Sequence, residues 1–284
     1  MFADDTKMFR GITDNADHQQ LQTDIDKLVA WSAVWHLSFN PAKCKIMTLG
    51  REQVAPCYTM THRNTVINIE RSSLERDLGI TVDNGLHFVE HMHTTAKKAN
   101  GIMAVIRRTF MQLDPKCFML LYKALVRPHL EYGVTTWFPY KMKDIELIES
   151  VQKRATKQVM RLKQLHYSER LQRLHLPTLR YRRHRGDMIE VFKILRNVYD
   201  PEITKGMLQL SNNTKTRGHL LKLCAQPARL DIRKYSFAVR VIKPWNSLPE
   251  EVVMSSSVKM FEARLDKFWK DQPMKYDYKE ELHL

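Results

Sequence analysis

The spacing of apolar residues changes near residue 90, and this change constrains the fold more than any other feature of the chain. Before it, short apolar and β-branched runs are separated by turn-forming residues, a pattern typical of antiparallel strands. The runs cover residues 44–49, 57–60, 66–69 and 78–82. After it, apolar residues recur at the spacing of amphipathic helices. The sequence therefore predicts an α+β protein, with a small antiparallel region in residues 1–90 and a mostly α-helical region in residues 91–284.

One helix is expected in the first region, over residues 18–36, with Asp17 as its N-cap. Trp31 and Trp35 of this helix are expected to pack in the core against the sheet.

The second region contains five apolar stripes at helical spacing. They run from Ala96 to Phe110, Phe118 to Leu125, Ile145 to Leu162, Tyr181 to Leu195 and Val258 to Trp269. Pro115 is expected to start the second of these helices, and Pro128 to end it. Thr178 is expected to cap the fourth.

Positive charge is concentrated in the middle of the chain. The formal net charge is +15, and residues 96–185 hold 20 Lys and Arg against 6 Asp and Glu. Residues 1–95 hold 9 against 12. Because a merely soluble basic surface would spread its charge more evenly, the excess indicates a face that binds a polyanion such as nucleic acid.

Several cations are candidates for contact with backbone phosphates. One group shares the polar side of the predicted helix 145–162 and consists of Lys153, Arg154, Lys157 and Arg161. The other candidates are Arg107, Arg108, Arg127, Arg182 and Arg183. The last two belong to an arginine cluster at 180–185, part of which is expected to pair with Asp187 or Glu190.

Other constellations favour structural roles. Four aromatic residues could stack on bases but are expected in the core, namely Tyr122, Tyr132, Trp137 and Tyr140. His87, His91 and His93 invite a zinc interpretation, although a loop and a helix start account for them better. The four cysteines form no CxxC pair, which suits a reducing compartment, and no signal peptide or membrane-spanning stretch is visible. An intracellular location, cytoplasmic or nuclear, is expected.

The chain opens with the sequence FADDTKMFRGI from Phe2, in which Asp4 and Asp5 are adjacent. Two segments follow in order, LQTDIDKLVAWSAVWHLSFNPAKCKIMTLG and LERDLGITVD. Together the three segments resemble the catalytic hairpin, the next helix with its lysine loop, and the primer-grip hairpin of reverse transcriptases from non-LTR, LINE-type, jockey-like retrotransposons. Downstream, LYKALVRPHLEYGVTTWFP, IELIESVQKRATKQVMRL and PWNSLPEEVV resemble the thumb and post-thumb segments of the same elements.

This resemblance implies a site and its chemistry. Asp4 would be a ligand of Mg²⁺ with Asp5 beside it, and Lys43 would neutralise the leaving pyrophosphate. Family members supply another metal-binding Asp from a strand well upstream, and no residue here corresponds to it. The resemblance therefore implies an N-terminally truncated RNA-directed DNA polymerase, with an ancestral two-metal activity that this chain alone is expected to lack.

The resemblance also implies domains and partners. Residues 1–90 would be the end of the palm with the primer grip, and residues 91–284 a thumb and post-thumb region. The expected partners are RNA and RNA–DNA hybrid, with dNTP as a substrate of the full-length ancestor and no membrane. Two alternatives stay open: a non-catalytic basic remnant that binds nucleic acid, and a translated fossil with no selected role.

Overall fold

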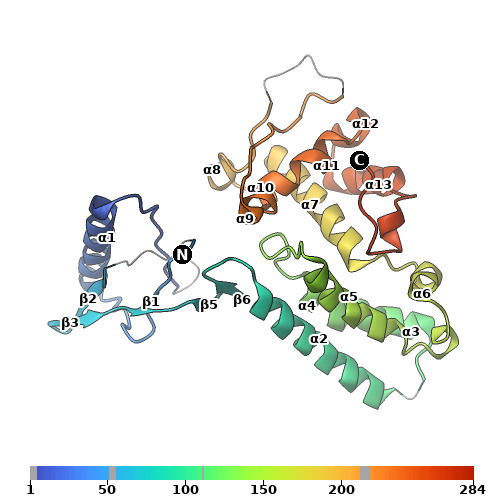
Figure 1. Cartoon of the computed structure of the whole chain (residues 1–284), viewed down its shortest axis with the longest axis horizontal. Coiled ribbons are helices and arrows are strands. Elements are labelled where there is room, and N and C mark those ends of the chain that lie inside the picture. The colour runs from blue at the N-terminus through green and yellow to red at the C-terminus, as the bar shows by residue number, and fades with distance from the viewer. Residues whose placement is uncertain (1–4, 51–55, 111, 212–217) are drawn as a thin grey trace. The chain divides into compact units, whose positions relative to one another are not determined.

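The chain divides into two units, residues 1–86 and residues 87–284 (Figure 1). The computed structural model describes residues 5–50, 56–110, 112–211 and 218–284. The predicted α+β class is confirmed, because small sheets in the first unit precede a mostly helical second unit. No helix among these described residues is both long enough and apolar enough to cross a membrane.

Unit 1 consists of one helix and short strands. These are α1 (Asn15–Val34), β1 (Lys45–Ile46), β2 (Thr59–His62), β3 (Thr65–Asn68), β4 (Glu70–Arg71), β5 (Leu74–Asp77) and β6 (Ile80–Asp83). Strands β2 and β3, and strands β5 and β6, form antiparallel hairpins. Strand β1 pairs with β4 in parallel, so the expectation of antiparallel strands throughout is wrong for this pair. A parallel pair requires a crossover rather than a hairpin turn, and nothing in the local sequence signals it.

Both hairpin turns have the geometry that fits the twist of paired strands. Their central residues are Arg63 and Asn64 in one turn and Leu78 and Gly79 in the other, and all four have positive φ. Two such residues in succession are required by the type I′ turn. Asn and Gly adopt this conformation readily, whereas an apolar side chain such as that of Leu78 rarely does.

Helix α1 begins earlier than predicted. Asp14 is its N-cap and accepts a hydrogen bond from the amide of Asp17, at 3.1 Å. Asp17, the predicted cap, instead accepts hydrogen bonds from the amide and hydroxyl of Thr13. These bonds lower the pKa of the Asp17 carboxyl.

The core of unit 1 is small. Its buried side chains are Ile25, Tyr58 and Met60, and partly buried residues of α1 and the strands pack around them. Gln22 strengthens the contact between α1 and β2, because its amide group both accepts from and donates to the backbone of Thr59, each at 3.0 Å. A pocket of about 850 Å³ opens beside this core and is lined mostly by apolar surface.

The prediction that Trp31 and Trp35 lie in the core is wrong. Their side chains are 43% and 63% exposed. Helix α1 contacts the sheet through the side that carries Ile25, and Trp31 lies roughly 120° away around the helix. Trp35 is the C-cap of α1 and lies beyond its last turn.

Unit 2 contains all the remaining helices. The longer ones are α2 (Val89–Thr109), α3 (Pro115–Leu121), α5 (Met142–Thr156), α6 (Tyr167–Leu174), α7 (Leu179–Leu195) and α13 (Val258–Phe268). The shorter ones are α4 (Arg127–Glu131), α8 (Pro201–Thr204), α9 (Asp231–Lys234), α10 (Phe237–Arg240), α11 (Ile242–Asn246) and α12 (Glu250–Val253). A π-helical segment (Tyr122–Val126) and two 3₁₀ segments (Met160–Leu162 and Pro273–Lys275) complete the set.

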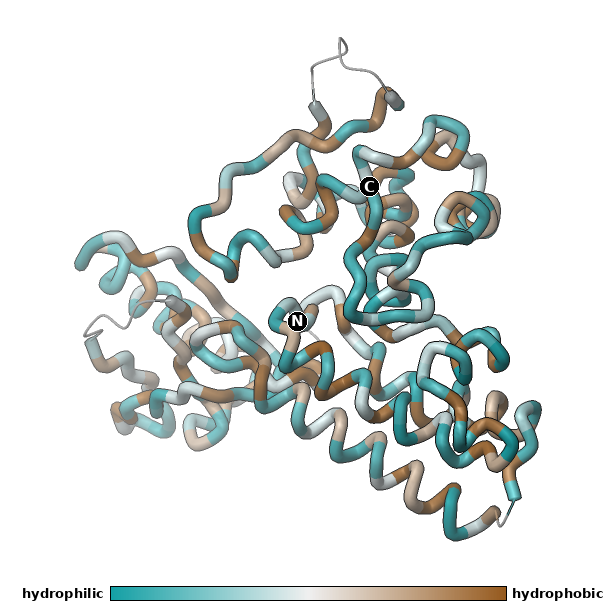
Figure 2. Tube along the Cα trace, turned by 45° about the vertical axis from the view of Figure 1, so that its right-hand side comes forward, coloured by the Kyte–Doolittle hydropathy of each residue, from teal (hydrophilic) through white to brown (hydrophobic). Residues whose placement is uncertain are grey.

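The helices of unit 2 are amphipathic, and hydrophilic and hydrophobic residues alternate along them (Figure 2). Helix α2 buries the predicted stripe at Ala96, Ala99, Met103 and Ile106, but Phe110, the last residue of that stripe, is the C-cap and is exposed. A second core joins α7, α11 and α13 around Trp245, Phe261 and Trp269, all with no exposed surface. Thr178 caps α7 as predicted, because its hydroxyl accepts from the amide of Tyr181. Pro128 does not end its helix: it lies in the first turn of α4, directly after the π-helical segment.

Helix α5 is shorter than its apolar stripe predicts. Val159 and Leu162 are buried, but the α-helix ends at Thr156 and they follow in a turn and a 3₁₀ segment. The carbonyl of Lys153 accepts hydrogen bonds from the hydroxyl of Thr156 and from the buried guanidinium of Arg170. These side chains satisfy a carbonyl that a continuing helix would use for its own backbone.

A buried polar network holds the helices around α5 together. The carboxylate of Glu149 accepts from the hydroxyl of Tyr167 at 2.6 Å and from the amide of Leu179 at 3.0 Å. Gln152 donates to that hydroxyl and accepts from the hydroxyl of Tyr122. Because Glu149 is fully buried, its pKa is raised, although these hydrogen bonds oppose the shift.

Candidate nucleic-acid interface

The residues predicted to carry catalysis lie in unit 1. Asp5 and Lys43 are both exposed, and Asp4 lies outside the described residues. Lys43 follows α1 in a turn whose amides donate to the carbonyl of Asn40. No contact in the described part of the chain brings Lys43 and Asp5 together.

The described residues do not fit a Mg²⁺ site. A protein-bound Mg²⁺ needs near-octahedral oxygen ligands, usually one or two carboxylates together with substrate phosphates and water. Within the described ranges, no group of three or more His, Cys, Asp and Glu side chains could hold a metal ion. Asp5 therefore belongs to no such group among the described residues, and one carboxylate alone does not form a two-metal centre.

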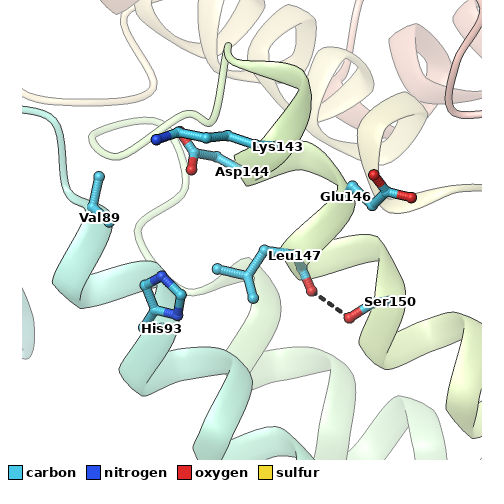
Figure 3. Close-up of a pocket in the computed structure, with 7 residues that line it drawn as sticks. All are labelled: Val89, His93, Lys143, Asp144, Glu146, Leu147 and Ser150. Carbon is cyan, nitrogen blue, oxygen red and sulfur yellow. Dashed lines mark hydrogen bonds between the residues drawn. The ribbon is translucent and has the colours of Figure 1, made fainter.

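Helices α2 and α5 of unit 2 lie side by side with their N-terminal ends together. Val89 and His93 of α2 line an open pocket of about 410 Å³ opposite Lys143 and Leu147 of α5 (Figure 3). In this view the side chains of His93 and Leu147 point toward one another. The two helices therefore run in the same direction, and residues further along each helix continue the same seam.

Cations gather on the solvent side of this seam. Lys97 and Arg108 lie within about 60° of His93 around α2, and Arg154 and Lys157 lie within about 40° of Ser150 around α5. We call the following exposed residues the α2–α5 basic face: Lys97, Arg107, Arg108, Arg154 and Lys157. Arg161, on the 3₁₀ segment after α5, is also exposed.

These cations are not neutralised within the described part of unit 2. None of the five has an ion pair with a described residue, and Arg154 donates only to the hydroxyl of Ser150, at 3.1 Å. Cations in the last turn of a helix interact favourably with the helix dipole, by about 0.3–1 kcal/mol. Arg107, Arg108 and Arg154 lie in the last turns of α2 and α5, and Lys157 is the C-cap of α5, so this effect accounts for part of their placement. It does not account for Lys97, which lies in the middle of α2.

Four other predicted phosphate contacts are engaged inside the protein. Lys153 lies over the rings of Tyr167 and Tyr278, at 5.7 and 5.2 Å from their centroids. Arg127 and Arg182 both pair with Glu131.

The fourth, Arg183, is buried. Its guanidinium nitrogens have no hydrogen-bond partner among the described residues, and burial lowers its pKa to about 10. The structure therefore does not present Arg183 to a ligand.

The arginine cluster at 180–185 is largely structural, but its partners differ from those expected. Arg180 pairs with Glu281 and Arg185 pairs with Asp266, whereas Asp187 pairs with Arg240. All three pairs join residues far apart in the sequence, so the spacing within α7 gives no sign of them.

Sequence reasoning missed Lys97 as a member of the basic face. Lys97 and Arg108 are eleven residues apart, which places them about three turns apart on one side of α2. This spacing in the sequence could have identified Lys97 as a neighbour of Arg108 on the same side of the helix. His91 and His93 lie in the first turns of α2, as the interpretation of a helix start predicts: His91 is buried with its ring against Trp137, while His93 is exposed at the seam.

The comparison with known proteins points to one class, the RNA-directed DNA polymerases of transposons. The chain is similar to the probable RNA-directed DNA polymerase from transposon BS of Drosophila melanogaster, with 26% identity over 152 residues. The similar part covers 49% of this chain and 16% of that protein. No protein-family model matches the chain, and no solved structure is similar to it. The likeness supports a relationship to this class at the level of the family.

Proposed function

We propose that this chain binds the sugar–phosphate backbone of nucleic acid through the α2–α5 basic face. The observation that carries the proposal is the set of five exposed cations without acidic partners among the described residues. Unit 2 holds 37 Lys and Arg against 20 Asp and Glu, which attracts a polyanion to this unit. Phosphate contacts of this kind give affinity with little dependence on base sequence.

Within this proposal, the chain is part of a non-LTR retrotransposon reverse transcriptase. Unit 1 is the end of its palm, with β5 and β6 as the primer-grip hairpin, and unit 2 is its thumb and post-thumb region. The expected ligands are RNA and RNA–DNA hybrid, inside the cell. The resemblance of the sequence segments and the similarity to the transposon polymerase support this assignment.

A second candidate function is RNA-templated DNA synthesis at Asp4 and Asp5, with Mg²⁺ and with Lys43 beside the leaving group. The resemblance of the opening segment favours it. For this chain alone we propose binding without synthesis, because the described residues contain no group of three or more side chains that could hold a metal ion.

A salt series tests the binding proposal. In one variant, Lys97, Arg108, Arg154 and Lys157 are all changed to Gln, which removes four charges and keeps residues of good helix propensity. Binding of RNA and of RNA–DNA hybrid should weaken. The slope of log affinity against log salt should fall by about 0.7–0.9 for each phosphate that the variant no longer neutralises.

A matched variant separates this face from the general effect of charge. It changes Lys259, Lys267, Lys270 and Lys279 to Gln, which are exposed residues on α13 and the C-terminal segment. It removes the same amount of charge and should keep most of the affinity and nearly all of the slope. An equal decrease in both variants would mean that net charge, not the α2–α5 basic face, determines binding.

A further inference from the structure

Two tyrosine rings from distant parts of unit 2 lie stacked on one another. The rings of Tyr140 and Tyr235 are 4.2 Å apart between centroids and 11° from parallel. Both residues are partly exposed, so the expectation that Tyr140 lies in the core is wrong, as it is for Tyr132, which is 58% exposed. The ammonium of Lys141 lies over the ring of Tyr140 at 5.5 Å, and that of Lys234 lies over the ring of Tyr235 at 5.3 Å. Since the inner faces contact each other, these lysines occupy the outer faces, and we call the two rings the tyrosine stack.

A single buried arginine fixes both sides of the tyrosine stack. Arg240 donates to the carbonyl of Tyr235 at 3.0 Å and to the carbonyl of Thr135 at 2.9 Å. It also holds Asp187 with two hydrogen bonds and lies 4.2 Å from the ring centroid of Phe138. The segments that carry Tyr140 and Tyr235 are therefore joined through one guanidinium, which preorganises the two rings.

The surroundings of the tyrosine stack are electropositive. Lys141, Lys143, Arg233 and Lys234 are all exposed around it, with Asp231 as an exposed acid nearby in the sequence. Lys141 is the N-cap of α5 and makes no capping hydrogen bond. A cation is unfavourable at this end of a helix, where the dipole favours negative charge. Asp144, in the first turn of α5, supplies the negative charge that the dipole favours, and the exposed ammonium of Lys141 has no hydrogen bond or ion pair with a described residue.

We propose that the tyrosine stack is a stacking site for an unpaired base of single-stranded nucleic acid. A base lies on the outer face of Tyr140 or Tyr235, and the displaced lysine contacts the adjacent phosphate. Stacking of a base on an aromatic ring contributes more than an exposed cation–π contact does. The exchange of lysine for base is therefore favourable. Bases within a duplex already stack on one another, so the site selects single strands.

This inference rests on the proposed function, because both require a nucleic acid as the ligand. It adds that the bound form is single-stranded and that the contact is a stacked base. The test compares an unstructured RNA strand with the same strand carrying abasic nucleotides, so that the phosphates are identical. The wild-type chain should bind the normal strand about 5- to 150-fold more tightly for one stacked base. In Tyr140→Leu and Tyr235→Leu this ratio should approach one, while the salt slope stays unchanged.

Two further variants separate stacking from a merely structural role. Tyr235→Phe keeps the ring and should keep the ratio. Tyr276→Leu is the matched control, because Tyr276 is also partly exposed with a lysine over its ring but has no stacked partner among the described residues. Its ratio should equal that of the wild type.

The outcomes distinguish this inference from the proposed function. The four-residue variant of the α2–α5 basic face should weaken binding of both strands and keep their ratio. Equal binding of normal and abasic strands by the wild type, or an unchanged ratio in folded Tyr140→Leu and Tyr235→Leu, overturns the stacking site alone. Absence of binding to either strand overturns the proposed function and the stacking site with it.

Discussion

Removal of one hydroxyl group from the buried polar network should make the stability of unit 2 depend more strongly on pH. The change is Tyr167→Phe. The hydroxyl of Tyr167 donates to the fully buried carboxylate of Glu149 at 2.6 Å. Hydrogen bonds to charged groups contribute about 1.5–3 kcal/mol. Gln152, which donates to the same hydroxyl, keeps the carbonyl of Pro177 as a second acceptor at 3.0 Å. The substitution therefore mainly removes the hydrogen bond to Glu149. We expect the free energy of unfolding to drop by about 2 kcal/mol near neutral pH.

The dependence on pH follows from the protonation of Glu149. Burial raises the pKa of this carboxyl, and the hydrogen bond from Tyr167 lowers it. Without that bond the pKa rises further. A carboxyl with a raised pKa in the folded state contributes most stability below its unfolded pKa, and this contribution is lost as pH rises through the folded pKa. The variant should therefore lose more stability near pH 8 than near pH 4, by about 1.4 kcal/mol for each unit of added pKa shift.

Urea unfolding followed by tryptophan fluorescence measures this effect. Trp137, Trp245 and Trp269 are buried in unit 2, whereas Trp31 and Trp35 of unit 1 are exposed, so the change in emission reports mainly on unit 2. Tyr276→Phe is the control, since the hydroxyl of Tyr276 has no hydrogen bond to any described residue. A loss of stability that is the same at all pH values would refute the reasoning, because it would mean that the removed bond does not favour the charged carboxylate.

Further substitutions probe the rest of the fold. Arg240→Ala leaves the buried carboxylate of Asp187 without its ion pair and should cost about 3–5 kcal/mol in urea unfolding, and a cost under about 1 kcal/mol would contradict a desolvated pair. Trp35→Ser should change stability by less than about 0.5 kcal/mol, because the side chain is exposed, whereas Trp245→Ala should cost about 3–5 kcal/mol. Given primed RNA, dNTPs and Mg²⁺, the purified chain should add no nucleotides, and templated extension abolished by Asp4→Ala with Asp5→Ala would overturn that expectation.

The sequence predicted the structure correctly where the packing of an element depends on one of its own faces. The apolar stripe of α2 and the cap at Thr178 both depend on residues within a few positions of one another, and both are confirmed. The exposed cations at Arg107, Arg108 and Arg154 follow from the same periodicity.

Interactions between distant residues could not be predicted in this way. The end of α5 depends on Arg170, which reaches back to a carbonyl 17 residues earlier. Glu131 forms an ion pair with Arg182, which lies 51 residues later in the sequence. Because of this pairing, Arg182 is not one of the free surface cations. Tyr235 was not a candidate for any role, because its importance arises only from its contact with Tyr140. Such contacts depend on how the helices pack, which no local pattern records.

The small core of unit 1 has a consequence for the lifetime of the chain in a cell. With Ile25, Tyr58 and Met60 as the buried apolar side chains among its described residues, this unit opens at a lower free energy than the helices around Trp245 and Trp269. Proteases cut the open form in proportion to its population when opening is fast. Turnover should therefore begin within residues 1–86, and a fragment close to residues 87–284 should accumulate as the long-lived product.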